Sequence, residues 1–509
     1  FRNLDATAEL VKYIDLRGKT ITNTSHVVGY SMLGNMGVHR FTFELSVDGD
    51  VFYKGETSFG WFVPEVFEKQ VGLDNGKKVQ PWHISQRLAR ADGIVKYDMT
   101  SDTDRRRLFA KAEGEKLLRR SKQVEFLDTI TLLPMSGVYK KGYVHGQKIV
   151  DKNDWFFSCH FWCDPVMPGS LGVESMYQMM EAFCIHSGVG GDMTQRCFEH
   201  DLGKVSWKYR GQLTPKNNKM DAEVHIKSVT HRAGQYVVIA DGFLLVDNLR
   251  VYSTKNMRLI VQESEEQIAA VAKPVPRARP LQQARSTTLL PRKEQFSSQV
   301  GRRAPARRDP PAGCLITDRN PPNGLTWHPL AGVNGNPTPF FSPTKYPPRA
   351  ITFVPFPNNP NDSNHEPGVL PLSWYNMCEF MCGRVSACLG QEFKRFDNST
   401  TSRSPAFDLQ VVTRVISVTN LEKGKFYNVD VNPSKGTMVA QFDVPEDAWF
   451  FKANSRDGLM PYSILMEIGL QTSGILTSWV KAPLTMDKDD ILFRNLDATA
   501  ELVKYIDLR

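Results

Sequence analysis

The sequence predicts an α+β fold in which two antiparallel sheets each wrap around a long central helix. Three observations favour it: two apolar stretches of helical length, strand-like runs associated with each of them, and a seventeen-residue segment that occurs at both ends of the chain. A helix that is apolar on nearly all sides must be buried, and a sheet curled around it provides that burial. The two units would form a pseudo-dimer within one chain of 509 residues.

The first half of the chain contains strands, a charged run and a long helix. Strand-like runs occur at 38–45 and 51–53, and the run Asp104–Arg107 is expected in a solvated loop. The first apolar helix is expected over Ser170–His186. Alternating runs between turn residues then predict three or four strands over 204–262.

The second half repeats the arrangement around another apolar helix. The stretch Trp374–Gly390 has apolar residues at helical spacing, which is typical of a core helix. The stretch Ser463–Val480 is apolar on nearly all sides and is expected to be the second buried helix. Its strands would come partly from 490–509 and partly from 19–62.

Repetition of the end segment changes the expected order of the domains. Phe1–Arg17 is identical to Phe493–Arg509, which indicates either a tandem array or a circular permutation. We therefore expect a domain over 325–509 that is completed by strands from 18–70, and a second domain over 80–262. Both copies would claim the same place in one sheet, so we expect one copy to be ordered and the other displaced.

Composition and charge exclude several classes of protein. Hydrophobic residues make up 41% and charged residues 23%, which is an ordinary globular composition. No uncharged apolar run reaches the ~18 residues of a membrane span, and no leader follows Phe1, so no targeting signal is expected. The formal charge of +8 arises within Gln267–Gly324, where eleven Lys and Arg face three Asp and Glu. This excess predicts a basic, proline-rich linker over 263–324; an RNA-binding or partner-docking tail is the alternative, and no nucleic-acid partner is expected.

The eight cysteines do not form a metal-binding pattern. Cys159/Cys163 and Cys378/Cys382 have a C-x3-C spacing, but neither pair has the His or second Cys pair that a zinc site needs. We expect reduced, mostly buried thiols in a cytoplasmic protein, and no metal.

The segment Trp155–Met176 (WFFSCHFWCDPVMPGSLGVESM) carries the chemistry. His160 precedes a proline-bounded turn, after which Ser170 is expected to be the N-cap of the buried helix. The backbone N–H groups of Gly169 and Ser170 would remain unpaired there and could hold a developing oxyanion. Burial would raise the pKa of Glu174 on the same helix, so that it could donate a proton near neutral pH. This combination suits proton abstraction beside a thioester carbonyl with loss of a β-hydroxyl.

The string WFFSCHFWCDPVMPGSLGVES strongly resembles the active-site motif of the β-hydroxyacyl-[acyl-carrier-protein] dehydratase/isomerase family, which has the hot-dog fold. The wider chain resembles the tandem dehydratase region of polyunsaturated fatty acid synthases. The resemblance implies a double hot dog. It also implies that His160 is the catalytic histidine, that the Gly169 N–H polarises the thioester carbonyl, and that Glu174 matches the acidic partner, where the best-known members carry Asp.

The other half resembles a degenerate copy of the motif. Trp449–Phe451 and Met460–Glu467 align with Trp155–Phe157 and Met167–Glu174, but the intervening piece is one residue shorter and contains no histidine. In the family's dimers the histidine of one protomer works with the acid of the other. The resemblance therefore implies a composite site of His160 and Glu467, with Glu174 facing the inactive site.

The resemblance implies dehydration of a 3-hydroxyacyl thioester to a trans-2-enoyl thioester, with His160 as base, Glu467 as acid and no cofactor. The substrate would arrive on the phosphopantetheine of an acyl carrier protein, within a fatty acid synthase of several domains or subunits. The sequence leaves open whether the chain also shifts the double bond to cis-3 and whether two chains form a homodimer. The alternatives are a non-catalytic acyl-binding module and a hot-dog thioesterase.

Overall fold

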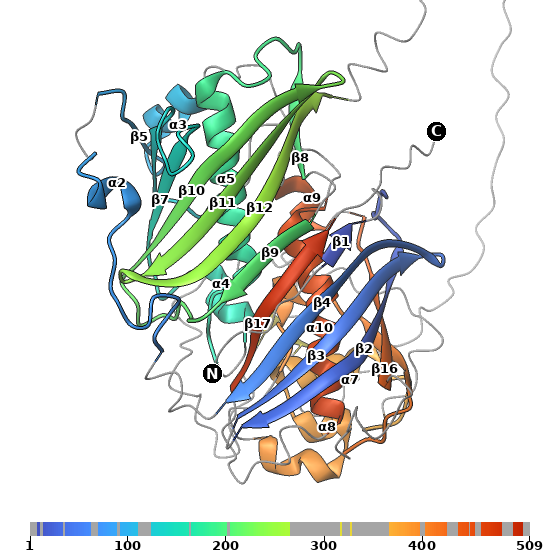
Figure 1. Ribbon diagram of the computed structural model, residues 1–509. Helices are drawn as coiled ribbons and strands as arrows, with labels where there is room; N and C mark the ends of the chain where they lie inside the picture. Colours follow the sequence, from blue (N-terminus) through green and yellow to red (C-terminus); the bar gives the residue numbers. More distant parts are fainter. Residues whose placement is uncertain are drawn as a thin grey trace, which may run out of the picture.

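The computed structural model in Figure 1 contains two long helices, each partly enclosed by curved strands. It describes residues 8–10, 14–33, 36–62, 70–88, 92–109, 124–161, 164–200, 204–264, 316–317, 326–327, 366–397, 403–424, 436–446, 448–453, 460–480 and 492–501. The predicted linker over 263–324 lies almost entirely outside these residues.

The described strands and helices have the following bounds. The strands are β1 (Ala8–Leu10), β2 (Thr20–Leu33), β3 (Met36–Val47), β4 (Asp50–Phe62), β5 (Val95–Asp98), β6 (Thr129–Leu133), β7 (Tyr143–Ile149), β8 (Arg196–His200), β9 (Lys204–Tyr209), β10 (Lys219–Arg232), β11 (Gln235–Val246), β12 (Leu249–Glu263), β13 (Ile316–Thr317), β14 (Thr326–Trp327), β15 (Arg414–Thr419), β16 (Gly436–Asp443) and β17 (Leu492–Glu501). The helices are α2 (Trp82–Ser85), α3 (Asp102–Phe109), α4 (Trp155–Cys159), α5 (Gly169–Ser187), α7 (Trp374–Cys382), α8 (Val385–Leu389), α9 (Trp449–Ala453) and α10 (Tyr462–Trp479), with 3-10 turns η4 (Gln391–Phe396) and η5 (Phe407–Leu409).

One half of the molecule is built around α10. The antiparallel strands β15, β16, β2, β3 and β4 follow one another in the sheet, and α10 packs against β16, β2, β3 and β4. Residues of β16 alternate between buried and half-buried, as expected for a strand with one face on a core. The helix lies so close to β3 that a Cβ atom on Gly469 would come within 2.6 Å of the Phe43 ring. This half therefore joins strands from near the N-terminus to a helix from near the C-terminus.

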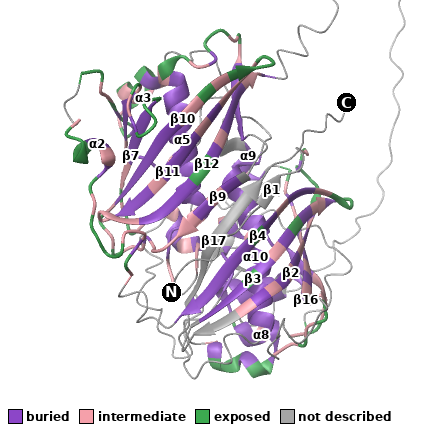
Figure 2. Ribbon diagram, in the orientation of Figure 1, coloured by how far each residue is buried: buried purple, intermediate pink, exposed green. Residues whose placement is uncertain are grey.

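The other half is built around α5. The sheet continues through β9, β12, β11, β10, β7, β6 and β5, with β8 paired to β12, and α5 packs against β7, β10, β11 and β12. Most residues of α5 are buried, as Figure 2 illustrates, and the same holds for α10. The predicted helices over Ser170–His186 and Ser463–Val480 are therefore confirmed, and so is the α+β class with two sheet-wrapped helices.

Strand β17 joins the two halves into one sheet. It pairs with β4 on one side and with β9 on the other, antiparallel to both. The first copy of the repeated segment takes up the same pairing further along, because Ala500 opposes Gly55 and so does Ala8 of β1. The prediction that only one copy would take this place is wrong, because the described residues of both copies pair with β4.

A direct contact between equivalent residues relates the halves by pseudo-symmetry. Trp155 of α4 and Trp449 of α9 occupy matching positions in the two motifs, and their rings lie 5.6 Å apart at 73°. Contact of a residue with its own counterpart is the signature of a two-fold interface. The described residues are therefore arranged as a pseudo-dimer.

Two local predictions need correction. The run Asp104–Arg107 is not a loop but lies in α3, where Leu108 is buried and Arg105 forms a 2.6 Å ion pair with Glu125. The stretch Trp374–Gly390 is buried as predicted, but it divides into α7 and α8 at Gly383.

Six cysteines within the described ranges are buried and reduced: Cys159, Cys184, Cys197, Cys378, Cys382 and Cys388. Cys163 and Cys314 lie outside the described residues. Of the helices that the structure describes, none has both the length and the apolar character needed to cross a membrane.

Candidate active site

His160 follows α4 at the edge of a pocket between the two halves. Its Nδ1 lies 2.9 Å from the carbonyl oxygen of Val166, and the N–H of Val166 donates to the carbonyl of His160 at 2.8 Å. A carbonyl can only accept, so Nδ1 carries the hydrogen, and in the neutral ring Nε2 holds the lone pair. The turn thereby orients His160 as a base.

The N-terminus of α5 lies beside His160. Pro168 is the N-cap, so the prediction of Ser170 as N-cap is wrong. Gly169 and Ser170 are the first two helical residues, where backbone N–H groups have no acceptor within the helix. A Cβ atom on Gly169 would still be 3.9 Å from the nearest neighbour, the Tyr252 ring, so the backbone is open to an approaching oxygen.

The Ser170 side chain contacts Glu467 from the other half. Ser170 Oγ donates to Glu467 Oε1 at 2.6 Å, which joins the start of α5 to the middle of α10. Burial raises the pKa of Glu467, whereas the hydrogen bonds from Ser170 and Gln471 lower it, and burial dominates. Glu467 is only 5% exposed, so its carboxyl group favours the neutral form.

Gln471 holds the second oxygen of this carboxyl group. Its Nε2 donates to Glu467 Oε2 at 3.1 Å and to the Leu409 carbonyl at 2.7 Å. Its Oε1 accepts from the Val411 N–H at 3.3 Å. The backbone of 409–411 thus fixes which end of the amide faces Glu467, and that end is a donor.

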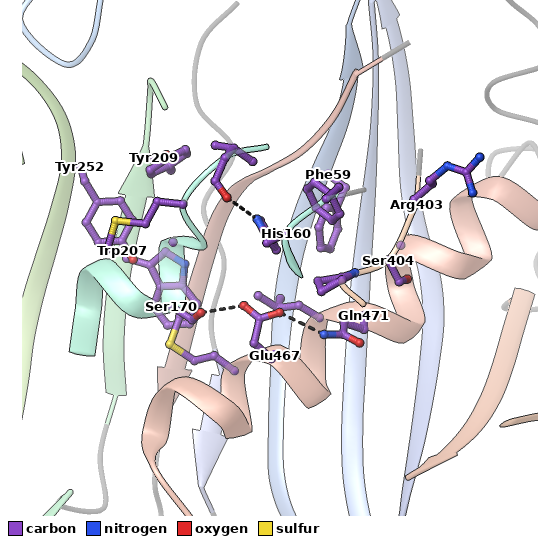
Figure 3. A pocket seen from close by; sticks show the side chains of 18 residues that line it. Phe59, His160, Ser170, Trp207, Tyr209, Tyr252, Arg403, Ser404, Glu467 and Gln471 are labelled. Carbon is purple, nitrogen blue, oxygen red and sulfur yellow. Dashed lines mark hydrogen bonds between the residues drawn. The ribbon is translucent and has the colours of Figure 1, made fainter. Parts of the chain in front are cut away.

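The pocket has a volume of about 690 Å³ and is predominantly apolar. Figure 3 shows His160 above Glu467, with Ser170 on one side and Gln471 on the other. The full lining comprises Phe59, His160, Phe161, Val166, Met167, Gly169, Ser170, Trp207, Tyr209, Tyr252, Arg403, Ser404, Pro405, Met466, Glu467, Leu470, Gln471 and Gly474. Four of the five predicted site residues therefore line one pocket; Glu174 does not.

Glu174 lies in the half of the interface without a histidine of the motif. It is 1% exposed on α5, at the position that corresponds to Glu467. There Tyr462 replaces Gly169, and its ring lies 5.3 Å from that of His200 and 6.0 Å from that of Tyr177. An aromatic cluster occupies the place that corresponds to the helix start at His160.

Sequence reasoning missed the residues that support and enclose the site. Gln471 had a signal, because a Glu-x3-Gln pattern occurs in both buried helices, as Glu174/Gln178 and Glu467/Gln471. Residues 403–405 had none, because they belong to the wall only through the fold.

No group of three or more His, Cys, Asp or Glu residues in the part of the chain that the structure describes is arranged to hold a metal ion.

Comparisons with known proteins identify the class. Residues 118–255, which include His160, Gly169, Ser170 and Glu174, match the FabA-like domain family. This region is a FabA-like hot-dog domain, and the resemblance of the motif is confirmed.

The particular relative is a subunit of a polyunsaturated fatty acid synthase, the one designated C, from Thraustochytrium sp. (strain ATCC 26185 / S-3). The chain is 43% identical to it over 408 residues. The match covers 72% of this chain and 26% of that protein, so the chain spans about a quarter of the relative's length.

Solved structures similar to parts of the chain include two dehydratases. One is the dehydratase heterocomplex ApeI:P from Xenorhabdus doucetiae, with 14% identity, a TM-score of 0.23, and coverage of 31% of this chain and 96% of that chain. The other is the dehydratase domain from the CurJ module of curacin polyketide synthase, with 10% identity, a TM-score of 0.25, and coverage of 49% and 77%.

Proposed function

We propose that the chain dehydrates 3-hydroxyacyl thioesters to trans-2-enoyl thioesters in polyunsaturated fatty acid synthesis. One observation carries this proposal: His160 from one half and the buried, neutral-favouring Glu467 from the other line the same apolar pocket. A base and an acid on opposite sides of a bound chain are what an elimination needs.

The reaction removes one proton and one hydroxyl group from the substrate. His160 Nε2 takes the proton from the α-carbon, and the electron pair of that C–H bond forms the α,β double bond. The Gly169 N–H stabilises the enolate-like carbonyl oxygen. The β-carbon–oxygen bond breaks as Glu467 protonates the leaving hydroxyl, which departs as water.

Gln471 determines which oxygen of Glu467 carries the transferred proton. Its amide donates to Oε2, so the proton resides on Oε1. Oε1 is the oxygen that contacts Ser170 Oγ at 2.6 Å, at the start of α5. We therefore assign Ser170 to positioning of the acid and Glu467 Oε1 to proton donation.

The substrate in this proposal is carried on the phosphopantetheine of an acyl carrier protein, and the chain works with other domains or subunits of a synthase. The similarity to a polyunsaturated fatty acid synthase supports this setting. The six described reduced cysteines fit a reducing compartment such as the cytoplasm. The proposed chemistry needs no cofactor, because proton transfers account for every bond change.

The test compares His160→Ala, Glu467→Gln and Glu174→Gln with the parent protein on a 3-hydroxyacyl pantetheine thioester, with enoyl product and free thiol both measured. We expect His160→Ala and Glu467→Gln to lower kcat by about 10²–10⁴-fold, and Glu174→Gln to retain most of the activity. Free thiol without enoyl product would identify a thioesterase, and neither product would identify a non-catalytic acyl-binding module. Loss of activity in Glu174→Gln but not in Glu467→Gln would refute the assignment of the acid.

A further inference from the structure

We infer that Gly474 determines how long an acyl chain the pocket accepts, an inference that rests on the proposed function. Gly474 lines the pocket and belongs to the same helix as Glu467, but it takes no part in the proposed proton transfers. It is therefore a specificity-determining position of the site and not a catalytic one.

Helix α10 forms one continuous wall of the pocket. Glu467, Gln471 and Gly474 are spaced four and three residues apart, so they share one face of the helix. Gly474 lies seven residues beyond Glu467, which is about 10 Å along the axis. An extended chain advances about 1.2 Å per bond, so a substrate reaches Gly474 some eight bonds beyond the reacting carbon.

The pocket is closed beyond Gln471. Arg403 and Ser404 are 4% and 2% exposed, and both line the pocket together with buried Pro405. Arg403 Nη1 donates to the carbonyl oxygens of Phe380 and Gly383 at 3.0 and 2.9 Å, which fastens this wall to the end of α7. Figure 3 shows Ser404 and Arg403 on the Gln471 side of Glu467. The space beside Gly474 is thus the blind end of the pocket.

The pseudo-symmetric position in α5 carries a large residue. The motif alignment places Glu181 opposite Gly474 in the two helices, seven residues after Glu174 and Glu467 respectively. Glu181 is 6% exposed and, with Gln178, lines a separate cavity of about 400 Å³. The half that retains His160's partner acid therefore has no side chain where the other half has a buried carboxylate.

A side chain at position 474 would shorten the pocket. The Cα–Cβ bond of a helical residue leans toward the helix N-terminus, which here is the direction of Gln471 and Glu467. A leucine would fill the space that the far methylene groups occupy. Each methylene that loses its burial lowers kcat/KM about fourfold.

The experiment measures Gly474→Ala and Gly474→Leu against the parent with 3-hydroxyacyl pantetheine thioesters of about six and about fourteen carbons, which end before and beyond Gly474. We expect kcat/KM for the short substrate to stay within about twofold, and that for the long substrate to fall about fourfold in Gly474→Ala and more than tenfold in Gly474→Leu. Ala favours a helix over Gly, so the first variant folds even if the second does not. Thr477→Val is the matched control, because Thr477 donates to the Ser473 carbonyl within α10 and does not line the pocket.

The same variants are tested for binding of saturated acyl pantetheine thioesters by calorimetry. A selective loss of affinity for the long chain supports the inference even if the parent protein shows no dehydration, which would refute only the proposed function. Equal losses for both chain lengths, or none, in the folded variants would overturn the role of Gly474.

Discussion

The contact between Ser170 and Glu467 makes a prediction about pH dependence. Ser170 Oγ donates to Glu467 Oε1 at 2.6 Å, and this hydrogen bond lowers the pKa that burial raises. Ser170→Ala removes the donor and leaves the burial, so the pKa of Glu467 rises further. A hydrogen bond to a charged group is worth about 1.5–3 kcal/mol, and one pKa unit corresponds to about 1.36 kcal/mol. The protonated acid should therefore persist to a pH about one unit higher or more.

The assay is the pH profile of kcat for dehydration of one thioester. If Glu467 must be protonated, activity falls on the alkaline side as it ionises, and Ser170→Ala should move this limb to higher pH. The pseudo-symmetric Ser463→Ala is the control, because Ser463 is the counterpart of Ser170 in the half without a histidine of the motif. We expect its profile to match the parent's.

The direction of the movement decides the argument. An alkaline limb that stays in place in Ser170→Ala, or that moves to lower pH, would refute the assignment of Glu467 as the acid that Ser170 positions. Equal movement in Ser463→Ala would show that the effect is not specific to this contact.

Three further predictions concern stability. Burial raises the pKa of Glu467 from its ordinary 4.5, so its stabilisation is present below that pH and is lost as the pH rises through the folded-state pKa; the melting temperature of Glu467→Gln minus that of the parent should therefore increase with pH, and a constant difference would contradict this. Gly146→Ala places a Cβ atom 2.7 Å from Leu127 Cδ1 and 2.9 Å from Met179 Sδ, so it should lower the free energy of unfolding by about 1–3 kcal/mol in urea titration; an unchanged midpoint would show that both side chains move aside freely. Arg403→Met removes two hydrogen bonds from a buried guanidinium to α7, so it should cost about 2–4 kcal/mol and raise KM for long substrates more than for short ones; a variant as stable as the parent would show that this wall does not depend on Arg403.

The helices were predictable because their sequences are apolar on nearly every side. A stretch such as Ser463–Val480 has no polar face to leave in water, so burial and helix length follow directly from its composition. The permuted order was predictable because the two copies of the end segment are identical, which no drift obscures. His160, Gly169 and Glu467 were identified through the motif and its degenerate copy, and the pocket brings them together.

What the sequence could not predict depends on partners distant in the chain. Ser170 had the composition of an N-cap, but its hydroxyl contacts a carboxylate 297 residues away. The charged run at Asp104–Arg107 has the appearance of a loop, yet α3 is held by the ion pair of Arg105 with Glu125 and by buried Leu108. Local patterns carry no information on such contacts, because the contacts arise only when the two halves pack.

The division of one sheet position between β1 and β17 has a consequence for how the midline of the molecule is assembled. Ala8 and Ala500 belong to identical sequences and oppose the same residue, Gly55. Side-chain recognition cannot discriminate between two identical candidates, so connectivity alone selects which copy bridges the halves. The seam of the molecule is accordingly specified by tether geometry, whereas every other rung of the ladder is specified by its amino acids.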